Sequence, residues 1–508
     1  MALARPAASL WAQCPDGTPP PCRPVTARDA AASRSVAVLD FLNESRDTTD
    51  AYLADGFTDE ITSRLGQIGR LVVTSRTAVR RLPDAATLSP EALGRRLNVT
   101  YLVNGSVRRG IGRVRVSVEL LRAGTGVTVW SNQYDRPSGD LLAIEEDLAT
   151  AVARAIAGQL LPAEQATLAA RPTGDAEAYD HFLRGNYDLA QRTGPTTQRA
   201  IAEYQAATAL DPGFVRARAR AAYAYGLYMD WGWPYPGVSR DSLLARGLRE
   251  ADLVLQQDSS LSDGWMARAY IVGHRDPRAF TGAAAAFERA IALDPRNAEA
   301  YHQYAWMLML LGQDSAAISM YRRSLALDPL RAITLDELSL LYFARGQYAD
   351  ALNLEDSAFV ADPQSFWVLA DRAHTKLRLG DLAGARDDAQ AAQRLGPAGF
   401  TYWGEAAGAI VAARYGDTAA AREAARRMEA AIAEPGRPTV LEARWIGGAL
   451  AAAGSLDEAV TFLQEVPTEQ RGAMLWFFLR FPEFDSLRTD PRFRRLVDEV
   501  RPPSARDR

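Results

Sequence analysis

The sequence predicts an α/β domain over residues 35–162, with elements in the order β-α-β-α-β-β-β-α, followed by an all-α solenoid of stacked helix pairs over residues 177–468. Two observations predict this fold. The amino-terminal part alternates short apolar runs with amphipathic segments, and the later part closes one helical run after another with Asp-Pro at regular spacing. At 508 residues the chain is also too long for one hydrophobic core, so separate packed units are expected.

The first half of the α/β domain contains two strand–helix steps. Residues 35–41 (SVAVLDF) and 71–75 (LVVTS) are short apolar runs typical of buried strands. In residues 51–65 apolar side chains recur every four positions and therefore share one face of a helix. Residues 89–97 (SPEALGRRL) begin with Ser at the N-cap position and Pro at the first helical position, which predicts a second helix.

The second half is expected to be an antiparallel meander closed by a helix. The runs YLVNGSVRRG, GRVRVSVELLRAGTG and VTVWSNQYDR alternate apolar and polar residues or are continuously apolar. The glycine-containing joints at 110–112 and 124–126 suit tight turns. Residues 140–160 then predict a long helix that leads into the repeats.

Charged residues in this domain have two interpretations. Asp55, Asp59 and Glu60 could hold a metal or act as acid and base. We favour a structural interpretation, in which Asp55-Gly56 is a turn and the two later acids favour a helix start. The arginines within 108–115 could contact a phosphate, but we favour solvated charges that discourage strand-to-strand aggregation.

The carboxy-terminal part repeats with a fixed period. Asp-Pro closes helical runs at Asp294, Asp328 and Asp362, which are evenly spaced along the chain. Proline cannot continue a helix and Asp favours turns, so each Asp-Pro ends one unit and sets the start of the next. Small residues keep the same register in three successive units: Gly312, Gly346 and Gly380; Ala317, Ala351 and Ala385; Ser324, Ala358 and Ala392.

Successive Asp-Pro pairs are 34 residues apart, which is the period of the tetratricopeptide repeat. The sequence therefore resembles this repeat, in which each unit is a pair of antiparallel helices. We expect about seven or eight units, because one pair cannot bury its apolar face alone, and residues 469–508 to cap the last unit with a polar outer face. The resemblance implies that the concave face, lined by first helices, binds an extended peptide or a helix of a protein partner. The candidate contacts on that face are Trp306, Asp336, Leu340, Phe343 and Trp367.

One unit departs from the period. The interval from Asp211 to Asp258 is longer than one repeat, and the excess includes YMDWGWPYPG at 228–237. These rings could pack on the solenoid or form an aromatic lip over a binding groove. We favour the packed loop.

The segments SVAVLDF, LADGFTDEI, YLVNGSVRR, GRVRVSVELL and VWSNQYDR resemble the TolB-like, or FlgO-like, amino-terminal domain. The resemblance implies a fusion to tetratricopeptide repeats that commonly follows a class III adenylate cyclase domain, a CadC-type DNA-binding domain or a serine/threonine kinase. It supplies no catalytic residues to carry over. Because only the short segment 1–34 precedes the domain here, we expect any such effector to be on another chain.

Other classes of function are disfavoured. Lys and Arg total 58 against 62 Asp and Glu, so the charge balance gives no attraction to nucleic acid. No kinase, phosphate-loop or nucleophile-elbow motif occurs, and no apolar stretch of the roughly 18 residues of a membrane span. We therefore expect no enzymatic activity, no cofactor and no metal. The four histidines, His181, His274, His302 and His374, fall in separate units and form no metal-binding pair. His302 and His374 are on first helices that could face the concave groove, and we favour half-exposed helix residues.

Residues 1–34 are either a Pro-rich tail or the remnant of a secretory signal, interrupted by Arg5 and Pro6. Cys14 and Cys22 could be two unrelated thiols or a disulfide formed in an oxidising compartment. The second possibility favours a periplasmic or secreted protein, and a cytoplasmic location is the alternative.

Overall fold

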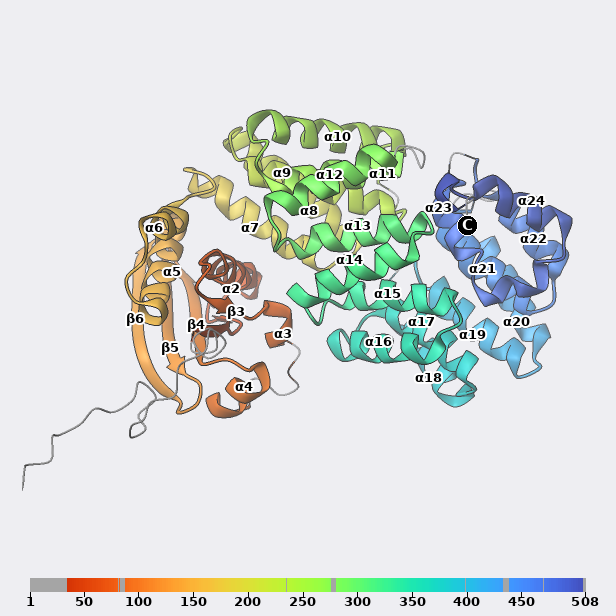
Figure 1. Ribbon diagram of the computed structural model, residues 1–508, viewed down its shortest axis with the longest axis horizontal. Helices are drawn as coiled ribbons and strands as arrows, with labels where there is room; N and C mark the ends of the chain where they lie inside the picture. Colours follow the sequence, from red (N-terminus) through yellow and green to blue (C-terminus); the bar gives the residue numbers. More distant parts are fainter. Residues whose placement is uncertain are drawn as a thin grey trace, which may run out of the picture.

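The computed structural model describes residues 34–505 except 81, 83–86, 234, 276–279, 398, 433–437 and 469. Figure 1 shows a sheet with its helices at one end, stacked helices in the middle and a group of short helices at the carboxy-terminal end. The predicted fold class, an α/β domain followed by an all-α solenoid, is confirmed. Among the described helices, none is both long and apolar enough to cross a bilayer.

The α/β domain is built on a mixed sheet. In the described residues its strand order is β3-β1-β4-β5-β6, with β2 paired to β4. β1 runs parallel to β3 and β4, and β4, β5 and β6 form the predicted antiparallel meander. The strands are β1 (Ser35–Val38), β2 (Leu42–Asn43), β3 (Val72–Val73), β4 (Tyr101–Gly110), β5 (Arg113–Arg122) and β6 (Val127–Pro137).

Two helices, α2 and α5, provide most of the core against this sheet. The predicted apolar face of α2 is confirmed, since Phe57, Ile61 and Leu65 have no exposed surface. Ser89 caps α4 by accepting a hydrogen bond from the Ala92 N–H. The structure adds β2 and α3 to the predicted order. The helices are η1 (Thr48–Asp50), α2 (Ala51–Gly66), α3 (Arg76–Arg80), α4 (Pro90–Leu97), η2 (Ser138–Asp140), α5 (Leu141–Ala157) and α6 (Pro162–Ala169).

The predicted turn at Asp55-Gly56 and the predicted helix start at Asp59 and Glu60 are wrong, because these residues lie inside α2. Glycine is needed there for packing: a Cβ on Gly56 would lie 2.8 Å from a methyl carbon of Leu183, in the first helix of the solenoid. The glycine therefore marks a close approach of two helices and not a chain reversal.

The solenoid contains eight helix pairs within the described residues. In each pair the two helices pack side by side, and each pair packs on the next. The pairs are α7 (Ala176–Ala190) with α8 (Gly194–Leu210), α9 (Val215–Asp230) with α10 (Arg240–Gln257), α11 (Ser262–Arg275) with α12 (Phe280–Leu293), α13 (Ala298–Leu310) with α14 (Asp314–Leu327), α15 (Ala332–Ala344) with α16 (Tyr348–Ala361), α17 (Phe366–Leu379) with α18 (Leu382–Leu395), α19 (Tyr402–Arg414) with α20 (Thr418–Ala430), and α21 (Val440–Ala452) with α22 (Leu456–Glu465).

The repeated residues occupy the positions that the period predicts. The glycines between paired helices have positive φ, +72° at both Gly312 and Gly346, a conformation that L side chains rarely adopt. Asp294 and Asp362 accept hydrogen bonds from backbone N–H groups two residues later, which fixes the turn into the next unit. The small residues of the register are fully buried between helices: Ala317, Ala351, Ala385, Ser324, Ala358 and Ala392.

The α/β domain packs directly on the solenoid. Helix α2 lies against α7, where Tyr52 donates a hydrogen bond of 2.6 Å to Asp180 and the Arg184 guanidinium lies 4.2 Å from the Tyr52 ring centroid. Ser75 donates a hydrogen bond to Asp328, one of the Asp-Pro residues, at 3.1 Å. The repeat turn at Asp328 therefore also contacts the α/β domain.

The carboxy-terminal region does more than cap the last unit. Helix α24 has the expected amphipathic form, with Phe493, Leu496 and Val500 buried. The segment before it instead folds back onto the inner side of the solenoid, where α23 packs against α13 and α21. Its elements are α23 (Ala473–Phe478), η3 (Pro482–Leu487), α24 (Pro491–Val500) and η4 (Pro503–Ala505).

Candidate functional site

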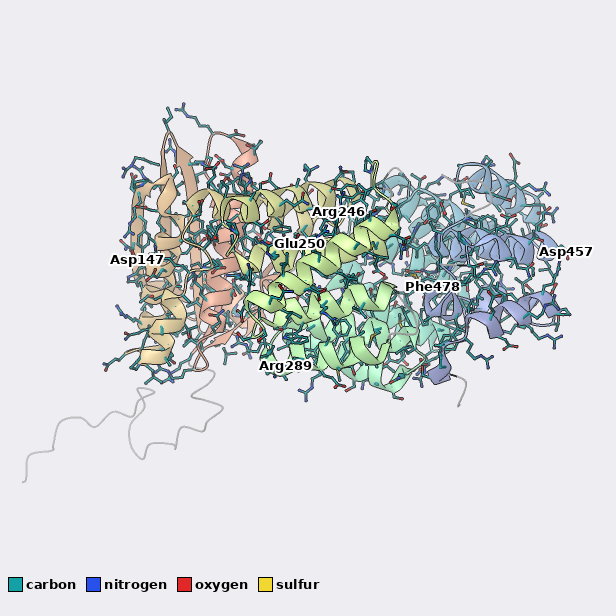
Figure 2. All side chains as sticks on the ribbon, turned by 90° about the horizontal axis from the view of Figure 1, so that it is seen from above. Asp147, Arg246, Glu250, Arg289, Asp457 and Phe478 are labelled. Carbon is teal, nitrogen blue, oxygen red and sulfur yellow. The ribbon has the colours of Figure 1, made fainter. Side chains whose placement is uncertain are left out.

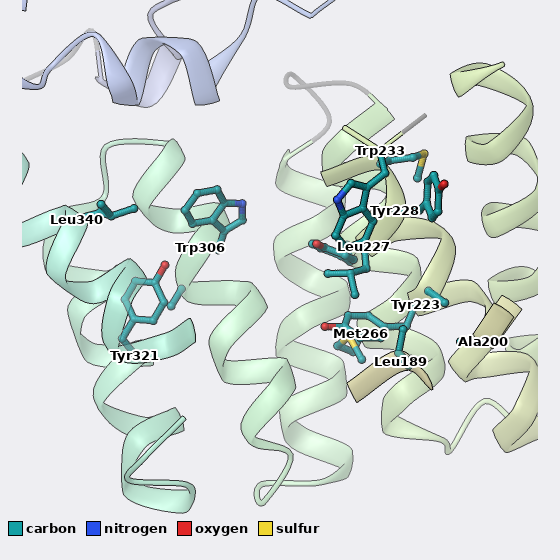
Figure 3. Packing of buried hydrophobic residues seen from close by; sticks show 14 of the residues in the cluster. Leu189, Ala200, Tyr223, Leu227, Tyr228, Trp233, Met266, Trp306, Tyr321 and Leu340 are labelled. Carbon is teal, nitrogen blue, oxygen red and sulfur yellow. The ribbon is translucent and has the colours of Figure 1, made fainter. Parts of the chain in front are cut away.

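The five predicted groove residues come from three successive first helices: Trp306 from α13, Asp336, Leu340 and Phe343 from α15, and Trp367 from α17. Four of them, all except Phe343, line one cavity. Figure 3 shows Trp306 and Leu340 on neighbouring helices, with Trp233 and Tyr228 of the second unit across from them.

The expectation of an open trough at these residues is wrong. Trp306, Asp336, Leu340 and Phe343 are each less than a tenth exposed, and Trp367 is half-buried. Side chains from elsewhere in the chain cover them. No single repeat could reveal this, because the covering residues lie far away in the sequence.

The carboxy-terminal segment supplies much of the cover. The Phe481 ring lies 5.3 Å from the ring of Phe343. Glu483 Oε1 lies 2.6 Å from His374 Nδ1. At the edge of the face, Arg480 forms a 2.9 Å ion pair with Asp314. Figure 2 shows Phe478 inside the molecule, between the repeats and the last helices.

The aromatic loop of the second unit supplies the rest. The Trp231 ring lies 5.3 Å from Trp367 and 6.5 Å from Trp403, in the sixth and seventh units. Trp233 reaches Phe400 at 6.4 Å between ring centroids. The loop therefore crosses the inside of the superhelix and packs there, so the packed-loop interpretation is confirmed and the exposed lip is not.

Arg444 on α21 lies at the centre of this assembly. Its guanidinium donates a short hydrogen bond to Asp371 and is 5% exposed. It also lies 4.4 Å from the ring centroid of Trp445 and 4.8 Å from that of Phe478. The arginine thus joins the eighth unit to the sixth through both an ion pair and cation–π contacts.

The cavity has a volume of about 60 Å³, and about 10–15 Å³ of such volume already holds one water. Five buried polar atoms on its lining residues have no hydrogen-bond partner among the described residues: the indole nitrogens of Trp306, Trp367 and Trp403, Asp336 Oδ1 and Asp371 Oδ2. The lining residues are Asp230, Trp231, Trp306, Ile333, Asp336, Glu337, Leu340, Trp367, Asp371, Trp403, Leu441, Arg444, Met474 and Phe478.

Three carboxyl groups around the cavity have pKa values above their usual range. Burial, together with the charges of Asp371 and Glu355, raises the pKa of Asp336 well above its usual value. Burial also raises the pKa of Asp371, although Arg444 opposes this. Burial and the charge of Asp230 raise the pKa of Glu337. The single positive charge of Arg444 does not balance the acidic side chains that line the cavity.

The expectation that His302 and His374 are half-exposed is wrong. His302 is 1% and His374 is 4% exposed, and each faces a glutamate. Burial and the charge of Arg331 hold the pKa of His302 well below its usual value. His181 is half-buried and forms a 2.6 Å contact with Glu203.

The acidic residues of α2 are used in ion pairs. Asp55 and Asp59 both pair with Arg76, and Glu60 pairs with Arg64 and Arg216. Within the described part of the chain, no group of three or more His, Cys, Asp or Glu side chains could hold a metal. Cys14 and Cys22, which could be free thiols or a disulfide, lie outside the described residues.

The sequence did not lead us to most of the other cavity residues, among them Trp403, Asp371 and Arg444. Trp403 could have been found, because it continues the 34-residue register of Tyr301, Leu335 and Leu369. Arg444 could not, because the connection before α21 is longer than in other units and breaks the register.

Comparison with known proteins supports the repeat assignment. Residues 286–319, one repeat length that covers the end of α12, α13 and the start of α14, match the family described as tetratricopeptide repeat. The chain is 30% identical over 205 residues to "Putative adenylate cyclase 3" of Rhizobium meliloti (strain 1021). That match covers 40% of this chain and 33% of the relative, so the chain spans about a third of the relative's length.

Solved structures that match parts of the chain include a thermophilic tetratricopeptide-repeat protein of Thermus thermophilus, at 18% identity, with 39% of this chain and 99% of that chain covered and a TM-score of 0.34. Yeast Tom70 is 14% identical, with 72% and 83% covered and a TM-score of 0.39. PilW, described as a type IV pilus biogenesis factor, is 20% identical, with 43% and 93% covered and a TM-score of 0.35.

Proposed function

We propose that this chain is a non-enzymatic protein-interaction scaffold whose concave face binds an apolar, aromatic-rich helical segment of a partner. One observation carries the proposal: that face already holds such a segment, α23 and η3, from the same chain. Leu475, Phe477 and Phe481 of this segment are no more than 1% exposed. The partner segment would take its place.

The contacts at the edge of this face indicate what a partner must offer. Arg480 is 23% exposed and pairs with Asp314, which is 19% exposed, so this ion pair remains partly accessible to solvent. A partner helix with aromatic residues on one face and a basic residue beside them would meet the same groups. The tetratricopeptide repeats found here suit this kind of recognition, because a stack of helix pairs presents a continuous inner surface.

The experiment weakens the internal segment without unfolding the chain. Arg480→Ala removes the partly exposed ion pair with Asp314, and Arg488→Ala is the control because Arg488 pairs with Asp485 inside the same segment. A fluorescent peptide of residues 472–489 serves as the partner probe, and its binding to each full-length variant is followed by anisotropy. Loss of about 1 kcal/mol of internal contact predicts about fivefold tighter peptide binding to Arg480→Ala and no change for Arg488→Ala.

Equal peptide binding by the wild-type chain and Arg480→Ala would argue against exchange at this face. If the peptide does replace the internal segment, Arg480→Ala becomes the better bait for capturing natural partners. More of each partner should then be recovered with this variant than with the wild-type chain.

A second candidate function is favoured by the adenylate cyclase relative. We propose that the chain is the regulatory half of a signalling system whose cyclase domain is on another chain, with the TolB-like resemblance of residues 35–162 as further support. Cyclic AMP formation from ATP should be undetectable with the purified chain. It should change by at least about fivefold, a usual coupling between sites, when the chain is added to a class III cyclase domain from its own organism. An unchanged rate would remove this candidate, and activity of the chain alone would overturn the non-enzymatic proposal.

We also propose that the protein is exported to the periplasm or secreted. The support is confined to the sequence, in the signal-like residues before Cys14 and the spacing of Cys14 and Cys22.

A further inference from the structure

The inner cavity combines two features that both favour a cation. Its walls include four tryptophans from four different units: Trp231, Trp306, Trp367 and Trp403. It also has more acidic than basic lining residues. Aromatic faces and carboxylates both attract cations, and neither group attracts anions.

The unpartnered atoms show what an occupant must supply. Asp336 and Asp371 are both 3% exposed, and each has one oxygen with no hydrogen-bond partner among the described residues. Ionised carboxylates accept hydrogen bonds or a positive charge and donate nothing. The indole N–H groups of Trp306 and Trp403 are also buried and unpartnered, so they need an acceptor, which a hydroxyl group or a water can provide.

The internal cation does not fill these needs. Arg444 donates to the other oxygen of Asp371 and lies over the rings of Trp445 and Phe478. Asp336 Oδ1 has no hydrogen bond from it. A buried charge without a partner is costly, so either Asp336 is kept protonated or a second cation enters.

We propose that the cavity binds a small organic ammonium ion, with its charge beside Asp336 and Asp371 and its carbon atoms against the tryptophan rings. An inorganic metal ion fits less well, because the described residues include no cluster of three or more metal-binding side chains and the walls are aromatic. The small volume selects an ion of few atoms, such as a methylated amine or an amino alcohol. Met474 and Phe478 of α23 are part of the cavity wall, so the site belongs to the form of the chain in which the internal segment is in place.

The test is isothermal titration calorimetry of the full chain with tetramethylammonium chloride and with ethanolammonium chloride, each against sodium chloride at equal ionic strength. Asp336→Asn keeps the side-chain shape and removes the charge, so it should weaken binding at least tenfold. Asp457→Asn is the matched control, because Asp457 is 92% exposed at the far end of the molecule (Figure 2) and should bind like wild type.

Trp367→Phe provides a second, independent variant, with Trp130→Phe on β6 as its control. Removing the larger ring from the cavity wall should weaken tetramethylammonium binding severalfold, whereas the β6 change should leave it unaltered. Circular dichroism establishes that each variant is folded, and if Asp336→Asn is not, the Trp367→Phe pair decides.

Two results would overturn the proposal. One is the absence of saturable heat from both ammonium salts up to about 10 mM, far above the range of ordinary ligand affinities. The other is binding that is equally strong in Asp336→Asn, Trp367→Phe and their controls, because the ion would then bind elsewhere. Binding of either ammonium salt with loss in the cavity variants supports the site, and the stronger salt shows whether methyl groups or N–H donors matter more.

Discussion

Replacing Arg444 by methionine should be among the most destabilising single changes in the solenoid. The arginine is 5% exposed, bonds Asp371 and lies within about 5 Å of three ring centroids, those of Trp445, Phe478 and Phe481. Methionine keeps the length of the side chain but leaves the Asp371 carboxylate buried without its ion pair. Removing one partner of a buried pair typically costs about 3–5 kcal/mol, a large part of the roughly 5–15 kcal/mol that stabilises an average domain.

The mutation is best measured as a double-mutant cycle. Urea unfolding followed by circular dichroism would compare Arg444→Met, Asp371→Asn and the double variant. Since the double variant buries no unpaired charge, it should recover at least about half of the loss seen in Arg444→Met. Arg427→Ala is the control, because Arg427 is 58% exposed and its ion pairs with Glu405 and Glu423 should contribute less than about 1 kcal/mol. A loss below about 1 kcal/mol for Arg444→Met, or strict additivity of the two changes, would refute the reasoning.

Three further predictions concern other parts of the chain. Burial raises the pKa of Glu355 to about 8, so its stabilising contribution is complete below the unfolded pKa near 4.5 and is lost as the pH rises toward 8. Urea unfolding would measure the free energy of unfolding of Glu355→Gln minus that of wild type, and this difference should therefore rise by about 3 kcal/mol between pH 5 and pH 8. A difference that does not change with pH would contradict the raised pKa of Glu355. On α19, a Cβ on Gly404 would lie 2.1 Å from a backbone nitrogen of α18, whereas one on Gly408 meets nothing within 4 Å. Gly404→Ala should thus lower stability by about 3 kcal/mol or more, and Gly408→Ala should raise it by up to about 1 kcal/mol; thermal melts with the same sign for both would be inconsistent with this packing. If the protein is exported, fractionation with thiol labelling should find Cys14 and Cys22 protected until a reductant is added, and cytosolic protein with both thiols free would contradict export.

The helix pairs could be predicted because each depends on local chemistry. Proline ends a helix wherever it falls, glycine permits the positive φ of Gly312 and Gly346, and the Asp side chain holds the next turn. These effects act over short distances along the chain, so a regular period in the sequence translates directly into a period in space. The same register extended by one unit leads to Trp403, on the cavity wall.

The closed inner face could not be predicted in the same way. It depends on Trp231 of the second unit meeting Trp367 and Trp403 of the sixth and seventh, and on Phe481 meeting Phe343. Such contacts follow from the curvature of the stacked pairs, which no short motif encodes. The buried state of His302 and His374 was missed for the same reason, since their positions on first helices indicate the inner side but not whether that side is covered.

The cover on the inner face also sets a limit on how a partner can bind. Five apolar side chains of the segment, Leu475, Phe477, Phe478, Phe481 and Phe484, are at most 2% exposed, and burial of that kind is worth about 1.5–3 kcal/mol each, or roughly 8–15 kcal/mol together as an upper estimate. A partner that touched only the edge of the face could not displace the segment. A partner with equivalent contacts would still compete against a segment that is tethered at an effective concentration in the millimolar range. Exchange at lower partner concentrations therefore requires a partner that is held close by through a second contact on this chain. Weakening the Arg480–Asp314 pair lowers the partner concentration needed for exchange only severalfold, which is the change that the peptide experiment is designed to detect.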